Sequence, residues 1–319
     1  MDLTKIMPSV VEASVRGKNF FFYGGPGTWK TTVATGFPKP IFAATERGYK
    51  FINGVYAQPI KTWRDAKEFL RELSRPEVEE MFETVVFDRI DTLYQLCYDF
   101  VLRTNGATAP DDPVFNGSGW TKIGNEWNKF INGLEVLNYG LVFICHDKDN
   151  EKEVEANTGA QRIDLQKTGL KPIRGICDFI FNIEKEYNAE TGEIYCYASS
   201  NSVSARTKKR ARYFPDKFLF TFKELQRNLD KAVEQQCKIE GIEAKVYERQ
   251  VSEKRSYEDV YNSVLNKVKE LSASESPCLP DYAQVQTVVL QGKRLSDVAT
   301  DERYYNQMLT LEAYLYDTK

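Results

Sequence analysis

The stretch Gly24-Gly25-Pro26-Gly27-Thr28-Trp29-Lys30-Thr31-Thr32 decides the fold of this chain. It follows the apolar run Phe20–Tyr23, which predicts a buried strand, and the residues after it can start a helix. In a glycine-rich loop between a strand and a helix, backbone N–H groups wrap phosphates and the helix N-terminus adds partial positive charge. We therefore expect residues 24–32 to bind a nucleotide, with Lys30 on its β and γ phosphates and the Thr31 hydroxyl on Mg²⁺.

One position departs from the usual pattern GxxxxGK[ST], because Trp29 stands where the last glycine belongs. A glycine there lets the backbone pass close to phosphate without a side chain. We expect the indole of Trp29 to point away from the nucleotide. The alternative interpretation of the whole stretch is a surface turn before a helix.

Short apolar runs alternate with helical patterns through the first half of the chain. The expected strands are Phe20–Tyr23, Pro40–Ala44, Thr84–Asp88 and Leu141–Cys145, and the expected helices include Trp63–Leu73, Ile90–Leu102 and Gly124–Leu137. The strands lack strict alternation of apolar and polar residues, which favours a mainly parallel sheet covered on both faces. Phe179–Glu184 and Ile194–Ser199 are expected to form an antiparallel edge.

Three polar residues follow expected strands and are candidates for the site. Asp88 fits a Walker B carboxylate that binds Mg²⁺, although many strands end in Asp as a turn residue. Glu46 could orient and deprotonate the attacking water, or be an exposed loop acid. His146, the single histidine, could sense the γ-phosphate or be a solvated residue. Asp91 is interpreted as a helix cap.

The densest basic cluster is Ser204–Arg212. Three interpretations stay open: a solvated face, a nucleic-acid patch, or a finger inserted into a neighbouring subunit's nucleotide site.

Length, charge and cysteine usage bound the remaining possibilities. A chain of 319 residues suits one large domain and a smaller appendage, and a net charge of -3 does not by itself predict nucleic-acid binding. The six cysteines form no CxxC pair, so a zinc site is not expected.

No apolar run approaches a bilayer span and Met1–Lys18 has no apolar signal core, so we expect a cytoplasmic protein without a membrane partner. From residue 223 charged helical patterns dominate, which predicts a core over 1–222 and a helical extension over 223–319.

Together these segments resemble the RecA-like ATPases of tailed phages, the group that includes the Sak-type single-strand-annealing recombinases. The resemblance rests on the phosphate loop, on Ile41–Gly48 ending a strand in Glu, on Thr84–Leu93, and on Gly140–Lys148 with His146. Asp178-Phe179-Ile180 and Ala205-Arg206-Thr207-Lys208 complete the order, which runs from about Arg16 to Phe222.

The resemblance implies a RecA-like P-loop core with a mainly parallel sheet flanked by helices, and ATP and Mg²⁺ as cofactors. It implies that Glu46 is the catalytic glutamate, that His146 couples the γ-phosphate to the next loop, and that Arg206 and Lys208 act in trans across subunits. Residues 147–170 and 103–119 would correspond to DNA-contacting loops, although Glu151, Glu153 and Glu155 interrupt the basic residues of the first. The family more often has Lys before Arg in the basic pair, and the resemblance does not extend to the tail after Lys223.

The function expected from this resemblance is ATP binding and hydrolysis by a phage protein that acts on single-stranded DNA in recombination or replication. A homo-oligomeric ring or filament follows from the trans pair, a phage single-strand-binding or replication protein is a possible partner, and the compartment would be the host cytoplasm. The alternatives are a ring DNA motor, such as a helicase or helicase loader, and a nucleotide-dependent switch that does not hydrolyse and recruits a partner. A protein that never touches nucleic acid also stays open.

Overall fold

A computed structural model of the chain describes residues 11–148, 162–189, 192–202, 206–245, 256–273 and 279–317. The chain divides into two compact units, Met1–Gln250 and Val251–Lys319. The first unit contains the sheet and the second contains helices, and each is described by itself.

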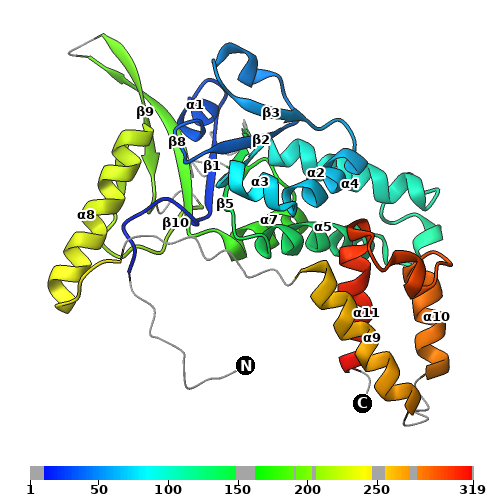
Figure 1. Cartoon of the computed structure of the whole chain (residues 1–319). Helices are drawn as coiled ribbons and strands as arrows, with labels where there is room; N and C mark the ends of the chain where they lie inside the picture. Colours follow the sequence, from blue (N-terminus) through cyan, green and yellow to red (C-terminus); the bar gives the residue numbers. More distant parts are fainter. Residues whose placement is uncertain are drawn as a thin grey trace. The chain divides into compact units, whose positions relative to one another are not determined.

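The main sheet of the described residues has nine strands, in the order β11-β9-β8-β1-β5-β4-β2-β3 with β10 paired to β8 (Figure 1). The strands are β1 Phe20–Gly24, β2 Pro40–Ala44, β3 Tyr56–Pro59, β4 Thr84–Asp88, β5 Gly140–Cys145, β8 Phe179–Asn188, β9 Glu193–Ser199, β10 Lys208–Lys209 and β11 Lys217–Leu219. From β8 to β3 all neighbours pair in parallel, whereas β9, β10 and β11 pair antiparallel to their neighbours. A separate ribbon joins β6 Asp147–Lys148 to β7 Arg162–Ile163.

Helices cover both faces of this sheet (Figure 1). They are α1 Lys30–Ala34, α2 Trp63–Leu73, α3 Pro76–Met81, α4 Ile90–Thr104, α5 Gly119–Glu135, α7 Lys167–Ile176 and α8 Phe222–Glu240. Side chains of β1 alternate between two cores: Phe21 and Tyr23 join the core that includes α2, α4, α5 and α7, and Phe20 and Phe22 join the core with α1 and α8. A strand with two covered faces needs apolar residues at every position, which is why these strands do not alternate in sequence.

The predicted α/β class is confirmed, with a mainly parallel sheet, flanking helices and helices at the C-terminal end. The antiparallel edge of β8 and β9 is confirmed too. The sequence did not predict β3, which is an exposed edge strand ending in Pro59, or α7, whose helical pattern is weakened by Pro172 and two glycines. Helix α5 begins at Gly119, ahead of the predicted start at Gly124.

Helix α8 belongs to the first unit, which differs from the predicted boundary between residues 222 and 223. Its buried residues Leu225, Leu229 and Ala232 pack into the same core as Phe22. It ends at Glu240 because Gly241 adopts a left-handed conformation, φ 67°, that closes the helix. Beyond it, Lys245 N donates to Val11 O, which ties the end of this segment to the start of the unit.

The second unit is mainly helical, as predicted for the C-terminal part. It contains α9 Tyr257–Ala273, α10 Leu279–Val289 and α11 Tyr305–Asp317. Its own buried cluster includes Val260, Leu290 and Leu311. Within the described ranges of the whole chain, no helix combines the length and apolar character that a membrane span requires.

Candidate nucleotide-binding site

The loop between β1 and α1 has two glycines whose backbone conformation or surroundings favour glycine. Gly24 has φ +156°, and a Cβ atom there would lie 2.2 Å from the carbonyl oxygen of Ile183 on β8. Gly27 has φ +70°, in the left-handed region that favours glycine. The loop therefore packs directly against β8, and its glycines allow this close approach because they have no side chain.

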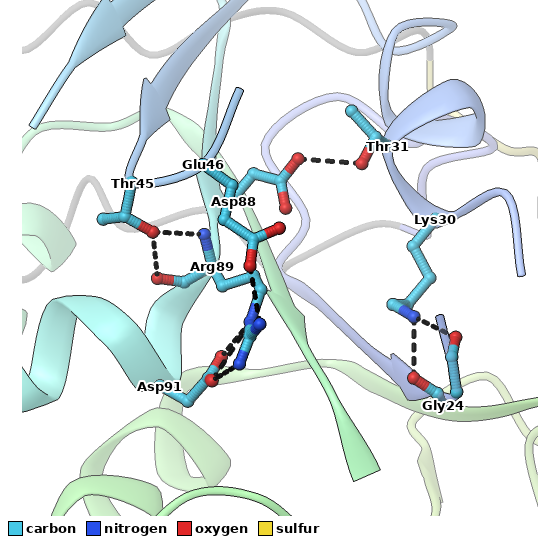
Figure 2. A network of polar contacts seen from close by, with 9 residues as sticks. Gly24, Lys30, Thr31, Thr45, Glu46, Asp88, Arg89 and Asp91 are labelled. Carbon is cyan, nitrogen blue, oxygen red and sulfur yellow. Dashed lines mark hydrogen bonds and ion pairs between the residues drawn. The ribbon is translucent and has the colours of Figure 1, made fainter. Parts of the chain in front are cut away.

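Lys30 begins α1 and folds back into the loop. Its ammonium donates to Gly24 O at 2.7 Å (Figure 2). It also donates to Gly25 O at 2.8 Å and to Thr28 Oγ1 at 3.0 Å. Burial lowers the pKa of Lys30 to about 8, although the carboxylates of Asp147 and Asp88 partly offset this effect. The loop thus holds a buried cation whose charge is stabilised by carbonyl oxygens and nearby acids, and an anion bound there would stabilise it further.

Thr31 and Asp88 meet at the other side of the loop (Figure 2). The Thr31 hydroxyl donates to Asp88 Oδ2 at 2.8 Å, which joins the start of α1 to the end of β4. Asp88 is buried, and this burial raises its pKa above the ordinary value, with the Thr31 hydrogen bond acting in the opposite direction.

Mg²⁺ fits this pair of oxygen donors. Hydroxyl and carboxylate oxygens are the hard ligands that Mg²⁺ takes, usually with one or two carboxylates, several waters and the phosphates of a nucleotide. The described residues contain no group of three or more His, Cys, Asp or Glu side chains arranged for a metal. The donor set therefore suits an ion held jointly with phosphates rather than one held by the protein alone.

Glu46 lies beyond the end of β2 and is paired with Arg89, which follows Asp88. Arg89 Nη1 lies 2.6 Å from Glu46 Oε1, and the same guanidinium forms a close ion pair with Asp91 (Figure 2). Thr45 Oγ1 accepts from Arg89 N at 2.8 Å, and Thr45 N donates to Asp88 O at 2.7 Å. The ends of β2 and β4 are thereby held together with Glu46 and Asp88 at the same edge of the sheet.

His146 follows β5 and lies among the charged groups of the site. Burial lowers its pKa, and the positive charges of Arg89 and Lys30 lower it further, so the imidazole is neutral at pH 7. A neutral imidazole can donate one hydrogen bond and accept another. Because β1, β2, β4 and β5 run parallel, their carboxyl ends bring Lys30, Glu46, Asp88 and His146 to one sheet edge, where ligands bind in open α/β sheets.

Comparison with known proteins agrees with this geometry. Residues 16–211, more than half of the chain, match the AAA domain family.

This chain belongs to the AAA domain family.

The whole chain is also similar to individual proteins. It is 26% identical over 279 residues to the SPbeta prophage-derived uncharacterized protein YorG of Bacillus subtilis (strain 168), covering 85% of this chain and 84% of that protein. Similar solved structures include the KaiC-like protein PH0186 from the hyperthermophilic archaeon Pyrococcus horikoshii OT3, at 15% identity and a TM-score of 0.34. The flagellar accessory protein FlaH of Methanocaldococcus jannaschii is 13% identical, with a TM-score of 0.31. These alignments cover 58% of this chain and, respectively, 78% and 77% of the two solved chains.

Trp29 departs from the usual glycine of the loop, and the structure shows how the AAA domain accommodates it. Its backbone is left-handed, with φ 59° and ψ 20°, the conformation in which glycine is favoured. The indole is 48% exposed. Of the other residues of the motif, Thr28 is buried, whereas Pro26 and Thr32 are exposed.

Arg206 and Lys208 differ in how they are held. Lys208 Nζ donates to Arg174 O at 3.0 Å at the end of α7, and its strand pairs with the beginning of β8. Arg206 is exposed. In the part of the chain that the structure describes, no hydrogen bond or ion pair joins either side chain to the phosphate loop.

The two segments expected to contact DNA have different outcomes. Most of 147–170 lies outside the described residues, which include only the β6–β7 ribbon and the start of α7. The segment 103–119 is well held, because Phe115 is buried and Asp112 Oδ1 accepts from Val114 N at 3.1 Å.

Two cations of the site do not stand out in the sequence. One is Arg89, and the expected helix cap at Asp91 is wrong, because Arg89 is the N-cap residue of α4 and the Asp91 carboxylate pairs with it. Lys185 on β8 donates to Pro26 O at 3.0 Å across the phosphate loop. A charged residue next to a Walker B aspartate was a signal for Arg89, whereas nothing in linear order connects Lys185 to a loop 159 residues away.

Proposed function

We propose that this AAA domain binds ATP with Mg²⁺ and hydrolyses it, as a RecA-like phage protein that acts on single-stranded DNA in recombination or replication. The observation that carries the ATPase proposal is the contact of Thr31 Oγ1 with Asp88 Oδ2 beside the buried ammonium of Lys30. These are the groups that a nucleotide's phosphates and its Mg²⁺ require, in one place.

Each residue of the site then has a task in hydrolysis. Lys30 binds the phosphates, and Thr31 and Asp88 hold Mg²⁺, which when bound neutralises charge on the phosphate oxygens. Glu46 accepts the proton of the attacking water at a carboxylate oxygen. His146 hydrogen bonds toward the γ-phosphate and passes its presence to the following loop, a role that its position after β5 among the charged groups supports.

The DNA and assembly parts of the proposal have separate support. The prophage-derived relative favours a phage origin. Arg206 supports a role in trans in a ring or filament, because its side chain is exposed and therefore available to a neighbouring subunit. Lys208 supports this role less, because its ammonium already donates a hydrogen bond to Arg174 O in α7. A phage single-strand-binding or replication protein is the proposed further partner.

The test is MgATP turnover by the full chain, with and without single-stranded DNA, alongside the mass of the assembly by light scattering. We expect turnover that DNA stimulates, an oligomer, and DNA binding that weakens as salt rises. Glu46→Gln should lower turnover by about 10²- to 10⁴-fold with ATP still bound. ATP binding without phosphate release would instead support a nucleotide-dependent switch. Unwinding of a forked duplex would support a ring DNA motor. Absence of DNA binding at low salt would contradict the role in recombination.

A further inference from the structure

The side chain of Glu46 is held in place by a polar contact with Arg89. It lies in a bend after β2, and its side chain is 41% exposed. Within the described residues, the polar contact of its carboxylate is with Arg89, at 2.6 Å from Oε1. An exposed glutamate without such a contact would sample many side-chain conformations, whereas a group that activates water has to stay within hydrogen-bonding reach of it.

Arg89, in contrast, is held by both Asp91 and Thr45. Its Nε donates to both carboxylate oxygens of Asp91, at 3.2 and 3.1 Å, and Nη2 forms a close contact with Asp91 Oδ2. Its main-chain N–H donates to Thr45 Oγ1, and its carbonyl accepts from the same hydroxyl at 3.2 Å. Because a guanidinium is planar, anchoring one side on Asp91 fixes the direction in which Nη1 points at Glu46.

Stability of α4 does not explain this arrangement. Arg89 is the N-cap residue of α4 and makes no side-chain capping hydrogen bond. A cation at a helix N-terminus is unfavourable, because the helix dipole places positive charge there. The partly exposed pair with Glu46 also contributes little to folding. The contact is better explained by what it does to Glu46.

We propose that Arg89 is the positioning residue of this site, which holds Glu46 by Oε1 so that Oε2 faces the reacting water. This inference rests on the proposed function, in which Glu46 accepts the proton of that water. Asp91 and Thr45 are the anchors through which the ends of β2 and β4 fix the geometry.

The test is a double-mutant cycle on MgATP turnover, with Arg89→Met, Glu46→Gln and the double variant. Arg89→Met should lower kcat by about tenfold or more while the affinity for MgATP changes by less than about threefold. Because Arg89 acts through Glu46, adding Arg89→Met to Glu46→Gln should cause no further loss. Arg89→Lys, which keeps the charge but loses the planar fork, should be intermediate.

The matched control is Arg47→Met, which removes an exposed cation next to Glu46 and should leave turnover at the wild-type level. If Arg89→Met does not fold, Arg89→Lys against Arg47→Lys decides the question. Wild-type kcat in the Arg89 variants, or an equal loss in the Glu46→Gln background, would overturn the positioning role alone. A wild type without turnover would overturn the proposed function and this inference with it.

Discussion

The ammonium of Lys30 is buried against carbonyl oxygens, and burial lowers its pKa to about 8. Phosphate bound beside it would favour the charged form and raise this pKa toward its ordinary value. At pH 8 the free protein carries about half a proton on this amine, so binding should take up about half a proton per site. Calorimetric titration of ATP in buffers of different ionisation enthalpy measures this uptake.

The control for this prediction is Lys30→Arg, whose guanidinium is charged at every accessible pH. It should show no uptake from this position. Wild-type binding at pH 8 with the proton count of the Lys30→Arg variant would contradict the account of Lys30.

Trp29 gives a second prediction at the residue scale, because its backbone is left-handed. A non-glycine residue pays about 1–2 kcal/mol for this conformation. Trp29→Gly should therefore unfold at a higher urea concentration than Trp29→Ala, although in an ordinary helical position alanine is the more stable of the two. If the alanine variant is as stable as the glycine variant, the assignment of a left-handed backbone to position 29 is wrong.

Several site residues could be predicted from sequence because each follows an apolar strand. Parallel strands bring their carboxyl ends to one edge, so Glu46, Asp88 and His146 had to lie near Lys30 once the strands were recognised. The pairing of Arg89 with both Glu46 and Asp91 depends on side-chain directions after β4, which linear order does not contain.

At the scale of elements, buried strands were easier to predict than exposed ones. β1, β2, β4 and β5 are continuous apolar runs that face two cores. β3 is an exposed edge, and β10 and β11 are two and three residues long, so none of them has a pattern that separates it from a loop. Tertiary pairing, not local preference, makes these segments strands.

The approach of the phosphate loop to β8 gives a prediction at this scale. Gly24→Ala would place a Cβ atom 2.2 Å from Ile183 O, a backbone atom that cannot rotate away. We expect a loss of about 1–3 kcal/mol of unfolding free energy and weaker ATP binding, because the loop must move. Chemical denaturation and ATP titration measure the two effects.

Gly48→Ala is the matched control, since a Cβ atom there has no neighbour within 4 Å. It should leave both quantities near the wild-type values. Equal behaviour of the two alanine variants would mean that the loop does not pack on β8 in this way.

At the scale of the whole molecule, the division of the chain follows from where α8 packs. Phe222 lies against Phe37, with ring centroids 5.2 Å apart, and a Cβ atom on Gly36 would be 2.5 Å from its ring. The change to a charged, helical composition near residue 223 was real, but α8 is amphipathic and its apolar side completes the core. Composition alone could not separate a packed helix from an appended one.

A fragment of residues 1–250 should therefore fold cooperatively and bind ATP, whereas a fragment of residues 1–222 should not. Losing α8 removes Leu225 and Leu229 from the core, and each buried leucine is worth about 2–5 kcal/mol. Circular dichroism with thermal unfolding distinguishes the fragments. A cooperative transition in the shorter one would restore the boundary predicted from sequence.

The most direct test of the central account is equilibrium binding of a fluorescent ATP analogue to the full chain, with Mg²⁺ or with EDTA. We expect binding that Mg²⁺ strengthens, at least about tenfold weaker binding by Lys30→Met, and an Asp88→Asn variant that has lost most of the Mg²⁺ effect. Wild-type protein that does not bind the analogue, or variants that bind it as tightly and with the same response to Mg²⁺, would contradict it.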